Sequence, residues 1–133
     1  MGRGSSKAGG SNGGGKFTSE EQFENSLKGF DDPRLTEYTN AYEEASNYNR
    51  GLRNNLNQAI NEDGYEAVES AIKTEEKMTK ADLARMPKEK TPAQLGEEVA
   101  LKERLDVIED LKKRKGTKGR GVGDIDIVNE RRR

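Results

Sequence analysis

The sequence predicts an all-α protein: a small helical bundle with a long C-terminal helix, a disordered Gly-rich N-terminal arm and a basic C-terminal tail with one short strand-like stretch. Apolar residues recur at helical spacing through the middle of the chain, and helix-capping patterns precede several of these stretches. The length of 133 residues suits one domain. We expect a flexible arm over residues 1–16, a helical domain over 17–115 and a basic flexible tail over 116–133.

The arm and the first helix are predicted from composition and capping. Residues 1–16 contain seven glycines and no large apolar residue after Met1, so nothing repays the entropy of ordering them. A helix is expected to begin near Thr18, because Thr18 and Glu21 have the spacing of a capping box. Phe23 and Leu27 would share one face of it, and Gly29 is expected to end it.

Two further helices are predicted before residue 61. Asp32 and Pro33 mark a helix start, because Asp caps well and Pro in the first position gives up an N–H that has no partner. Its apolar stripe runs to an end near Asn49 and consists of Leu35, Tyr38, Tyr42 and Ala45. Gly51 is expected to separate it from a second stripe, formed by Leu52, Leu56, Ala59 and Ile60.

The next helix is predicted to begin near Asp63. Asp63 and Glu66 repeat the capping-box spacing, and the apolar residues that follow share a face: Tyr65, Val68 and Ile72. Thr79 to Met86 is expected to form a short turn that ends at Pro87.

The last helix has the clearest signals. Thr91, Pro92 and Gln94 combine a cap, a first-position Pro and a polar residue three along, and Gly116 is expected to terminate the helix after Lys115. Its apolar face changes direction along the axis, with Leu95 and Val99 roughly opposite Leu101, Leu105 and Ile108. Either Gly96 interrupts the helix or its two halves touch different surfaces, which would leave one half available to another chain.

The composition argues against catalysis. The chain has neither His nor Cys, which removes the commonest general base, the commonest zinc ligand and every thiolate. We therefore expect a protein that is not an enzyme, with no catalytic residues, no metal site and no cofactor. No run of about 18 apolar residues occurs, so we also expect no membrane association and a cytoplasmic location.

Three near-motifs have simpler interpretations. Gly10 to Lys16 resembles a phosphate-binding loop, but Phe17 stands where Ser or Thr would hold magnesium and no strand precedes it. Asp124 and Asp126 resemble paired metal-binding acids within the strand-like Val122–Val128, but too little chain follows to support a metal cluster. Met1 to Ser6 fits the permissive pattern for N-myristoylation. A flexible arm and a solvated strand explain these segments better.

The charge distribution is uneven. Residues 17–72 carry four basic and twelve acidic side chains, whereas residues 111–133 carry nine basic and three acidic ones. An acidic face is expected to bind a basic partner, with a solvated helix face as the alternative interpretation. It comprises Glu20, Glu21, Glu24, Asp31, Asp32, Glu37, Glu43 and Glu44.

The basic run is the second candidate for partner binding. It consists of Lys112, Lys113, Arg114, Lys115, Lys118 and Arg120. Phosphate contacts need positive charge without fixed geometry, so nucleic acid is one candidate ligand. The alternative is that these cations favour the helix dipole and are otherwise solvated. Candidate contact aromatics are Tyr38, Tyr42, Tyr48 and Tyr65, although the first two have the helical spacing of core residues.

The opening, MGRGSSKAGGSNGGG, looks like the Gly/Ser/basic leaders of small bacteriophage and prophage accessory proteins. The resemblance covers about a tenth of the chain and carries over no functional residue. It implies one of two roles: an inhibitor of a host defence machine, such as an anti-CRISPR protein, or a minor virion component. It also implies a location in the bacterial host cell or in the virion.

We therefore expect a non-enzymatic binding protein that acts on a protein or nucleoprotein partner, such as a host defence nuclease, through an acidic helical surface and a basic tail. The alternative is a phage minor virion or assembly protein that oligomerises through its long helix.

Overall fold

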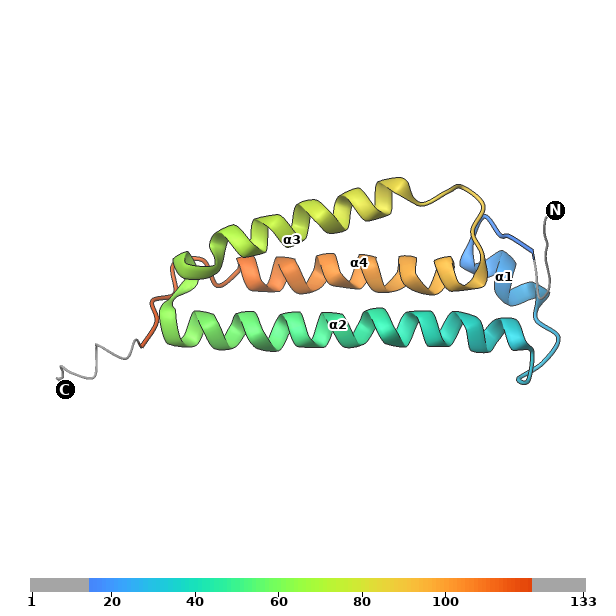
Figure 1. The fold of residues 1–133 in the computed structure, drawn as a ribbon, viewed down its shortest axis with the longest axis horizontal. Coiled ribbons are helices and arrows are strands. Elements are labelled where there is room, and N and C mark those ends of the chain that lie inside the picture. Colours follow the sequence, from blue (N-terminus) through green and yellow to red (C-terminus); the bar gives the residue numbers. More distant parts are fainter. Residues whose placement is uncertain (1–14, 121–133) are drawn as a thin grey trace. The chain divides into compact units, whose positions relative to one another are not determined.

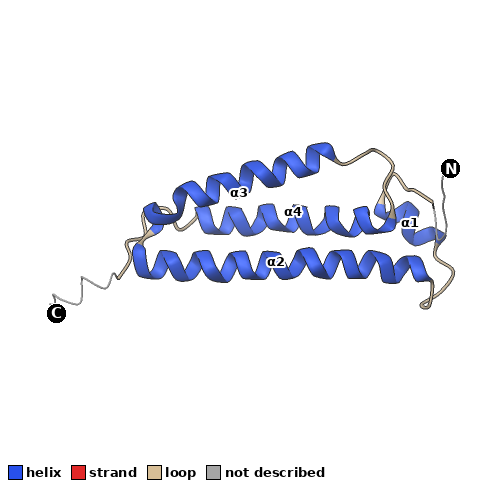
Figure 2. Cartoon of the chain, viewed as in Figure 1, coloured by secondary structure: helices blue, strands red, loops and turns tan. Residues whose placement is uncertain are grey.

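The computed structural model describes residues 15–120, which form four helices and no strand (Figures 1 and 2). The helices are α1 (Glu20–Ser26), α2 (Pro33–Asp63), α3 (Tyr65–Arg85) and α4 (Pro92–Lys112). They account for 75% of the described residues, which confirms the predicted all-α, bundle-like fold. The strand-like stretch Val122–Val128 and most of the Gly-rich arm lie outside these residues.

The chain divides into two units, and each of the three longer helices contributes to both. Unit 1 comprises Met1–Asn47 and Asp82–Lys102, and unit 2 comprises Tyr48–Ala81 and Glu103–Arg133. Each unit has its own apolar cluster.

Helix α1 begins one residue later than its capping pattern predicts. Ser19, and not Thr18, is the N-cap: its Oγ accepts a hydrogen bond of 3.0 Å from the backbone N–H of Gln22. The Gln22 side chain in turn accepts from the backbone N–H of Thr18 at 2.7 Å. The side chain that binds the backbone N–H of Thr18 therefore belongs to Gln22, and not to Glu21 as the capping-box spacing predicts. The helix ends at Ser26, before Gly29, because Leu27 adopts an extended conformation.

Helix α2 is continuous through Gly51, so the predicted break there is wrong. A glycine inside a helix costs about 1 kcal/mol relative to alanine. Apolar packing offsets this cost, because Leu52 and Leu56 pack against the unit 2 cluster and Ile60 is fully buried in it. The break comes instead at Gly64, which has a φ of 92° and therefore ends α2 in the left-handed conformation.

Helix α3 is longer than the sequence pattern indicates. It begins at Tyr65, directly after Gly64, so Asp63 is the last residue of α2 and not a cap. The turn predicted over Thr79 to Met86 is also wrong, because the helix runs through it to Arg85. The buried Thr79 hydroxyl donates to the Glu75 carbonyl at 2.7 Å, which satisfies this polar group inside the helix.

Helix α4 starts as predicted. The backbone N–H of Thr91 donates to the Gln94 side chain at 3.0 Å, and the backbone N–H of Gln94 donates to the Thr91 hydroxyl at 3.2 Å. This reciprocal pair is the capping box expected from the sequence. The helix ends at Lys112, and a tight turn follows to Gly116, which has a φ of 93°.

The unit 1 cluster is small and partly aromatic. Phe17, Phe23 and Leu95 are buried in it, and Leu27 and Tyr38 pack against it. The Phe17 and Phe23 rings lie 5.2 Å apart edge to face, and Tyr38 stacks on Phe23 at 5.5 Å. Two backbone hydrogen bonds of 2.8 Å between Phe17 and Lys90 hold the segment before α1 against the segment before α4.

The unit 2 cluster is larger and mostly aliphatic. Its seven buried members come from α2, α3 and α4: Ile60, Tyr65, Val68, Ile72, Val107, Ile108 and Leu111. Helix α4 is continuous through Gly96. Leu95, in its first half, is buried in the unit 1 cluster, so the two halves of α4 pack on different surfaces of the same chain. This explains the change in direction of its apolar face.

Gly96 is required by a close approach of two helices within unit 1. It is buried on α4. A Cβ atom there would collide with the Tyr38 carbonyl oxygen of α2 and lie 3.1 Å from the Tyr42 backbone nitrogen. By contrast, a Cβ atom at Gly51 would meet nothing within 4 Å.

The two helical glycines therefore predict opposite effects of the same substitution. Gly51→Ala is expected to raise the free energy of unfolding by about 0.5–1 kcal/mol, because alanine favours the helix and clashes with nothing. Gly96→Ala is expected to lower it by about 1–3 kcal/mol, because the backbone of α2 must move. Urea unfolding followed by circular dichroism measures both changes. A Gly96→Ala variant as stable as the parent would contradict the close approach.

Candidate partner-binding surface

Most of the acidic residues singled out in the sequence are exposed and unpaired. All eight lie in unit 1, on α1, on α2 or in the loop between them. Six are exposed, and their side chains form no ion pair with another described residue: Glu21, Glu24, Asp31, Glu37, Glu43 and Glu44. These six carboxylates are the candidate partner-binding surface, called the acidic surface below.

The other two predicted acids serve the fold. The Tyr38 hydroxyl donates to the Glu20 carboxylate. Burial and this bond raise the pKa of Tyr38. Asp32 is buried and bound by its neighbours, so it does not belong to the exposed acidic face on which the sequence pattern placed it. Its carboxylate is needed inside the chain because it closes the loop between α1 and α2.

Asp32 joins both ends of this loop, residues 27–32. Its carboxylate accepts from the backbone N–H of Lys28 at 3.1 Å and from that of Arg34 at 3.0 Å, which caps α2. It also accepts from the Arg34 guanidinium at 3.1 and 2.8 Å. Hydrogen bonds from Arg34 hold the pKa of Asp32 far below its usual range. The guanidinium also donates to the Ser26 carbonyl at 2.8 Å, which ties the end of α1 to the start of α2.

The tip of this loop carries an aromatic residue that the sequence analysis missed. The backbone N–H of Asp32 donates to the Gly29 carbonyl at 3.2 Å, so Phe30 and Asp31 occupy the centre of a tight turn. The Phe30 side chain is 100% exposed. Figure 1 shows this loop at the N-terminal end of α2. The sequence held a signal, because Phe30 falls outside both neighbouring apolar stripes and stands beside turn-forming residues.

The basic run divides into cations used within unit 2 and cations left exposed. Lys112 pairs with Glu76 of α3 at 2.8 Å, and Lys113 lies 3.7 Å from Asp110. The Arg114 guanidinium donates to the side chains of Asn57 at 2.8 Å and Asn61 at 2.6 Å. The remaining three members are exposed: Lys115, Lys118 and Arg120. Lys112 and Arg114 thus take part in helix packing, and a contact of either residue with a partner stays a prediction.

Residues 117–120 pack against the turn between α2 and α3, beyond the expected domain boundary at residue 115. The Tyr65 backbone N–H donates to the Thr117 carbonyl at 2.9 Å, and that of Arg120 donates to the Asn61 carbonyl at 2.9 Å. A Cβ atom at Gly119 would lie 2.5 Å from the backbone nitrogen of Asp63, so only glycine fits there. The start of the basic tail is therefore part of unit 2.

The four tyrosines are mostly structural. Tyr65 is buried in the unit 2 cluster, and the partly buried Tyr38 packs against the unit 1 cluster. Tyr42 is partly buried. Tyr48 is half exposed, but its hydroxyl donates to the Glu75 carboxylate at 3.0 Å and the Arg104 guanidinium lies 4.3 Å from its ring centroid. Helix packing thus occupies the tyrosines that were expected to face a partner.

Arg104 is a second residue that the sequence analysis missed. Its Nε donates to the side-chain oxygen of the buried Asn49 at 2.6 Å, in addition to its contact with Tyr48. It therefore joins α4 to α2 within unit 2 by polar contacts. A charged residue on a helix gives no sequence signal for such a partner 55 residues away.

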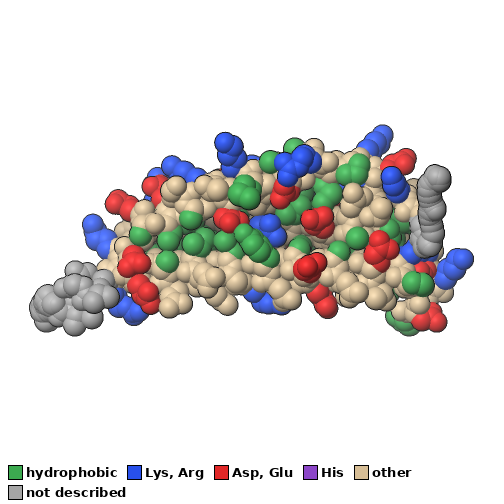
Figure 3. Space-filling view, viewed as in Figure 1, with side chains coloured by type: hydrophobic (Ala, Val, Ile, Leu, Met, Phe, Trp, Pro, Cys, Tyr) green, Lys and Arg blue, Asp and Glu red, His purple; other side chains and the backbone are tan. Residues whose placement is uncertain are grey.

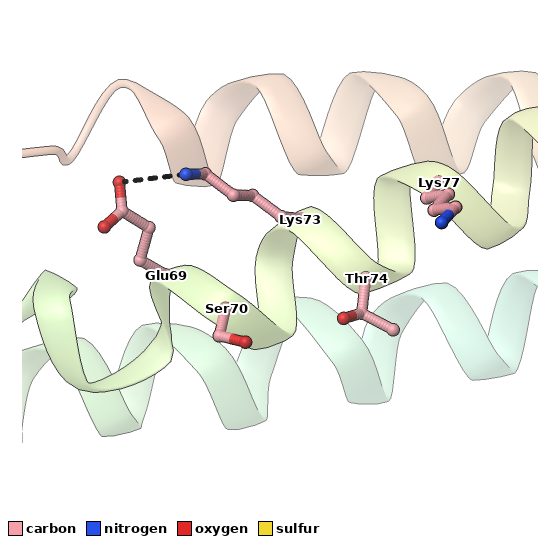
Figure 4. A pocket seen from close by; sticks show the side chains of 5 residues that line it. All are labelled: Glu69, Ser70, Lys73, Thr74 and Lys77. Atoms are coloured by element: carbon pink, nitrogen blue, oxygen red, sulfur yellow. Dashed lines mark ion pairs between the residues drawn. The ribbon is translucent and has the colours of Figure 1, made fainter.

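A surface hollow on α3 has the wrong character for a ligand site. Its lining comes from one helix (Figure 4): Glu69, Ser70, Lys73, Thr74 and Lys77. Ser70 and Thr74 point to one side of the helix, and the ion pair of Glu69 with Lys73, at 3.9 Å, lies on the other. The lining is polar and largely exposed, whereas small-molecule sites are enclosed and mostly apolar.

Residues 15–120 contain no group of three or more acidic side chains positioned to hold a metal ion. None of their helices combines the length and apolar character needed to cross a lipid bilayer. No protein-family model, curated protein or solved structure matches the chain.

The hydrogen bonds that Asp32 accepts from Lys28 and Arg34, called the Asp32 clamp below, predict a specific dependence of stability on pH. Because the folded pKa of Asp32 is depressed, the charged carboxylate stabilises the fold above its unfolded pKa of about 4. That contribution is lost as the pH falls from about 4 toward the folded pKa. Asp32→Asn keeps a capping side chain but removes the charge. Thermal melts of both proteins from pH 7 to 3 should show a lower melting temperature for the variant, with a difference that shrinks below pH of about 4.

Proposed function

We propose that this chain is a non-enzymatic binding protein whose acidic surface docks on a basic surface of a protein or nucleoprotein partner. The charge balance of the two units carries this proposal. Over the described residues, unit 1 has seven Lys and Arg against twelve Asp and Glu, whereas unit 2 has twelve against ten. Charge of one sign is therefore concentrated in unit 1.

The pairing of these charges supports the same conclusion. In unit 2, at least four of the ten described acids lie within ion-pair distance of a lysine: Glu69, Glu76, Glu109 and Asp110. The acidic surface of unit 1 has no such internal neutralisation. Figure 3 shows Asp and Glu side chains interspersed among Lys and Arg on the face of the molecule that it draws. Exposed carboxylates without partners attract a basic surface at long range and guide its approach.

The kind of partner is proposed from the sequence and the charge together. The resemblance of the opening segment to phage accessory proteins suggests a bacterial nucleoprotein machine, such as a defence nuclease, as the target. Such an assembly offers basic protein surfaces to the carboxylates. Three exposed cations near the end of unit 2 remain candidates for contacts with nucleic acid: Lys115, Lys118 and Arg120.

The alternative function, a virion or assembly protein that oligomerises through its long helix, rests on the rotating apolar face of α4. Leu95 at one end of that face is buried in the unit 1 cluster, and Val107, Ile108 and Leu111 are buried in the unit 2 cluster. Most apolar residues of the two halves are thus buried within this chain, and Val99 and Leu105 are partly buried. No observation in the described residues now favours oligomerisation through α4.

The acidic surface predicts a salt-dependent partner. We expect the immobilised full-length chain to capture a protein from bacterial extract, with an affinity that falls steeply as the salt concentration rises. Each exposed ion pair contributes up to about 1 kcal/mol, so replacing Glu37, Glu43 and Glu44 together by Gln should weaken binding about tenfold or more. Titration of the purified partner at several salt concentrations measures both effects.

The matched control neutralises three exposed acids of unit 2: Glu62→Gln, Glu66→Gln and Asp106→Asn. It makes the same change in net charge, so it should leave the affinity nearly unchanged if position matters. Equal weakening by both triple variants would mean that only net charge is sensed. An affinity that changes neither with the salt concentration nor in either triple variant would refute the proposal.

A further inference from the structure

Phe30 is the fully exposed large hydrophobic side chain of unit 1. Single exposed apolar residues are common on protein surfaces, so exposure by itself carries no conclusion. Phe30 differs in where it stands. It lies in the centre of a turn whose two ends are joined by the carboxylate of Asp32. The turn therefore presents the ring away from the helices on a fixed backbone.

The other exposed large hydrophobics of the described residues have different surroundings. Tyr48 is 49% exposed, but its hydroxyl is bound to Glu75 and its ring to Arg104. Met78 is 55% exposed and lies along α3. Neither projects from a loop. Phe30 alone among the three combines full exposure with a constrained turn.

A constrained aromatic is well suited to act as an anchor in a protein interface. Aromatic side chains are enriched in the centres of interfaces, where they fill pockets on the partner. A backbone that is already held in the bound conformation loses less entropy on binding. In this loop the holding contacts are internal to the chain: Asp32 binds Lys28 on one side and Arg34 on the other, and Arg34 binds Ser26.

We propose that Phe30 is the anchor of the interface, and that it enters an apolar pocket rimmed by Lys or Arg on a protein partner. This inference rests on the proposed function, since the same unit supplies the carboxylates that would meet the rim. Asp31, exposed in the same turn, is the carboxylate nearest in sequence. The turn thus presents an apolar ring beside an exposed carboxylate, and the complement of this pair is an apolar pocket beside a basic group.

The charge of unit 1 favours a protein pocket as the binding partner of Phe30 over two alternatives, a lipid surface and a second copy of the chain. A lipid surface that attracts proteins electrostatically is anionic, and the excess of acidic residues in unit 1 would be repelled by it. A second copy of the chain would bring two acidic units together, which is unfavourable for the same reason. A basic-rimmed protein pocket is the occupant that gains from both the ring and the carboxylates.

The test uses a defined probe, a library of random peptides displayed for selection against the immobilised full-length chain. Selected peptides are expected to combine Lys or Arg with aromatic or aliphatic residues. Fluorescence anisotropy of the synthetic peptides then gives their affinities for the parent and for Phe30→Ala. We expect Phe30→Ala to weaken binding by about tenfold or more, the range of an interface anchor. Its thermal melt should match that of the parent, because the ring makes no internal contact.

Met78→Ala is the matched control, because it removes an exposed apolar side chain of similar size from unit 2. It should leave the affinity unchanged. Asp32→Asn, which keeps Phe30 but weakens the clamp, should bind the same peptides less tightly than the parent at pH 7. Unchanged binding by Phe30→Ala, equal losses for Phe30→Ala and Met78→Ala, or peptides without the basic and apolar combination would each overturn the anchor.

Two further measurements address the other occupants. Anionic vesicles of phosphatidylglycerol should not bind the chain, and sedimentation should show a mass that does not change with concentration. Phe30-dependent binding to vesicles or Phe30-dependent self-association would replace the proposed partner and so refute it. If the triple variant of Glu37, Glu43 and Glu44 loses peptide binding while Phe30→Ala does not, the anchor fails and the proposed function stands. The reverse pattern refutes the role of the acidic surface.

Discussion

Scarcity of apolar side chains is the constraint on which the structure depends. The whole chain has 22 Leu, Ile, Val and Phe residues, and the buried hydrophobic clusters have only three and seven members. Clusters this small hold helices together only if the backbones come close. Gly96 provides such an approach in unit 1, where α4 meets the backbone of α2 at Tyr38. Gly119 provides another in unit 2, against the turn at Gly64. Gly96 and Gly119 are therefore packing residues.

Polar side chains add contacts between the helices to those of the small apolar clusters. The charged groups used in these contacts determine which charges remain exposed. In unit 2, Lys112 and Arg114 bind groups on α3 and α2, and Arg104 binds the buried Asn49. Cations that would suit an external phosphate are thus used for packing. In unit 1, Asp32 forms an internal ion pair with Arg34, and most other acids of α1 and α2 form no ion pair with another described residue. The proposed role of unit 1 in partner binding rests on this asymmetry in packing.

What the sequence could predict was local. The capping box of Thr91 and Gln94 was predicted correctly because its members are three residues apart. The cap at Asp32 was also predicted correctly, because the N–H that it binds belongs to Arg34, two residues along. Gly51 was misjudged because its helix is held by distant contacts that local propensity does not contain. For the candidate site, six of eight acids were placed on the surface correctly. Asp32 and Phe30 were misjudged or missed, because their roles depend on a loop closed through Arg34.

The acidic surface and Phe30 would act at different steps of association. Charges act over roughly 8–10 Å at physiological salt, so unpaired carboxylates raise the rate of encounter without fixing an orientation. An aromatic ring acts only on contact, but a turn held by Asp32 brings it there in one orientation, which slows dissociation. Neither feature gives selective, lasting binding without the other. A small helical chain could achieve both by placing the ring and the carboxylates on one unit.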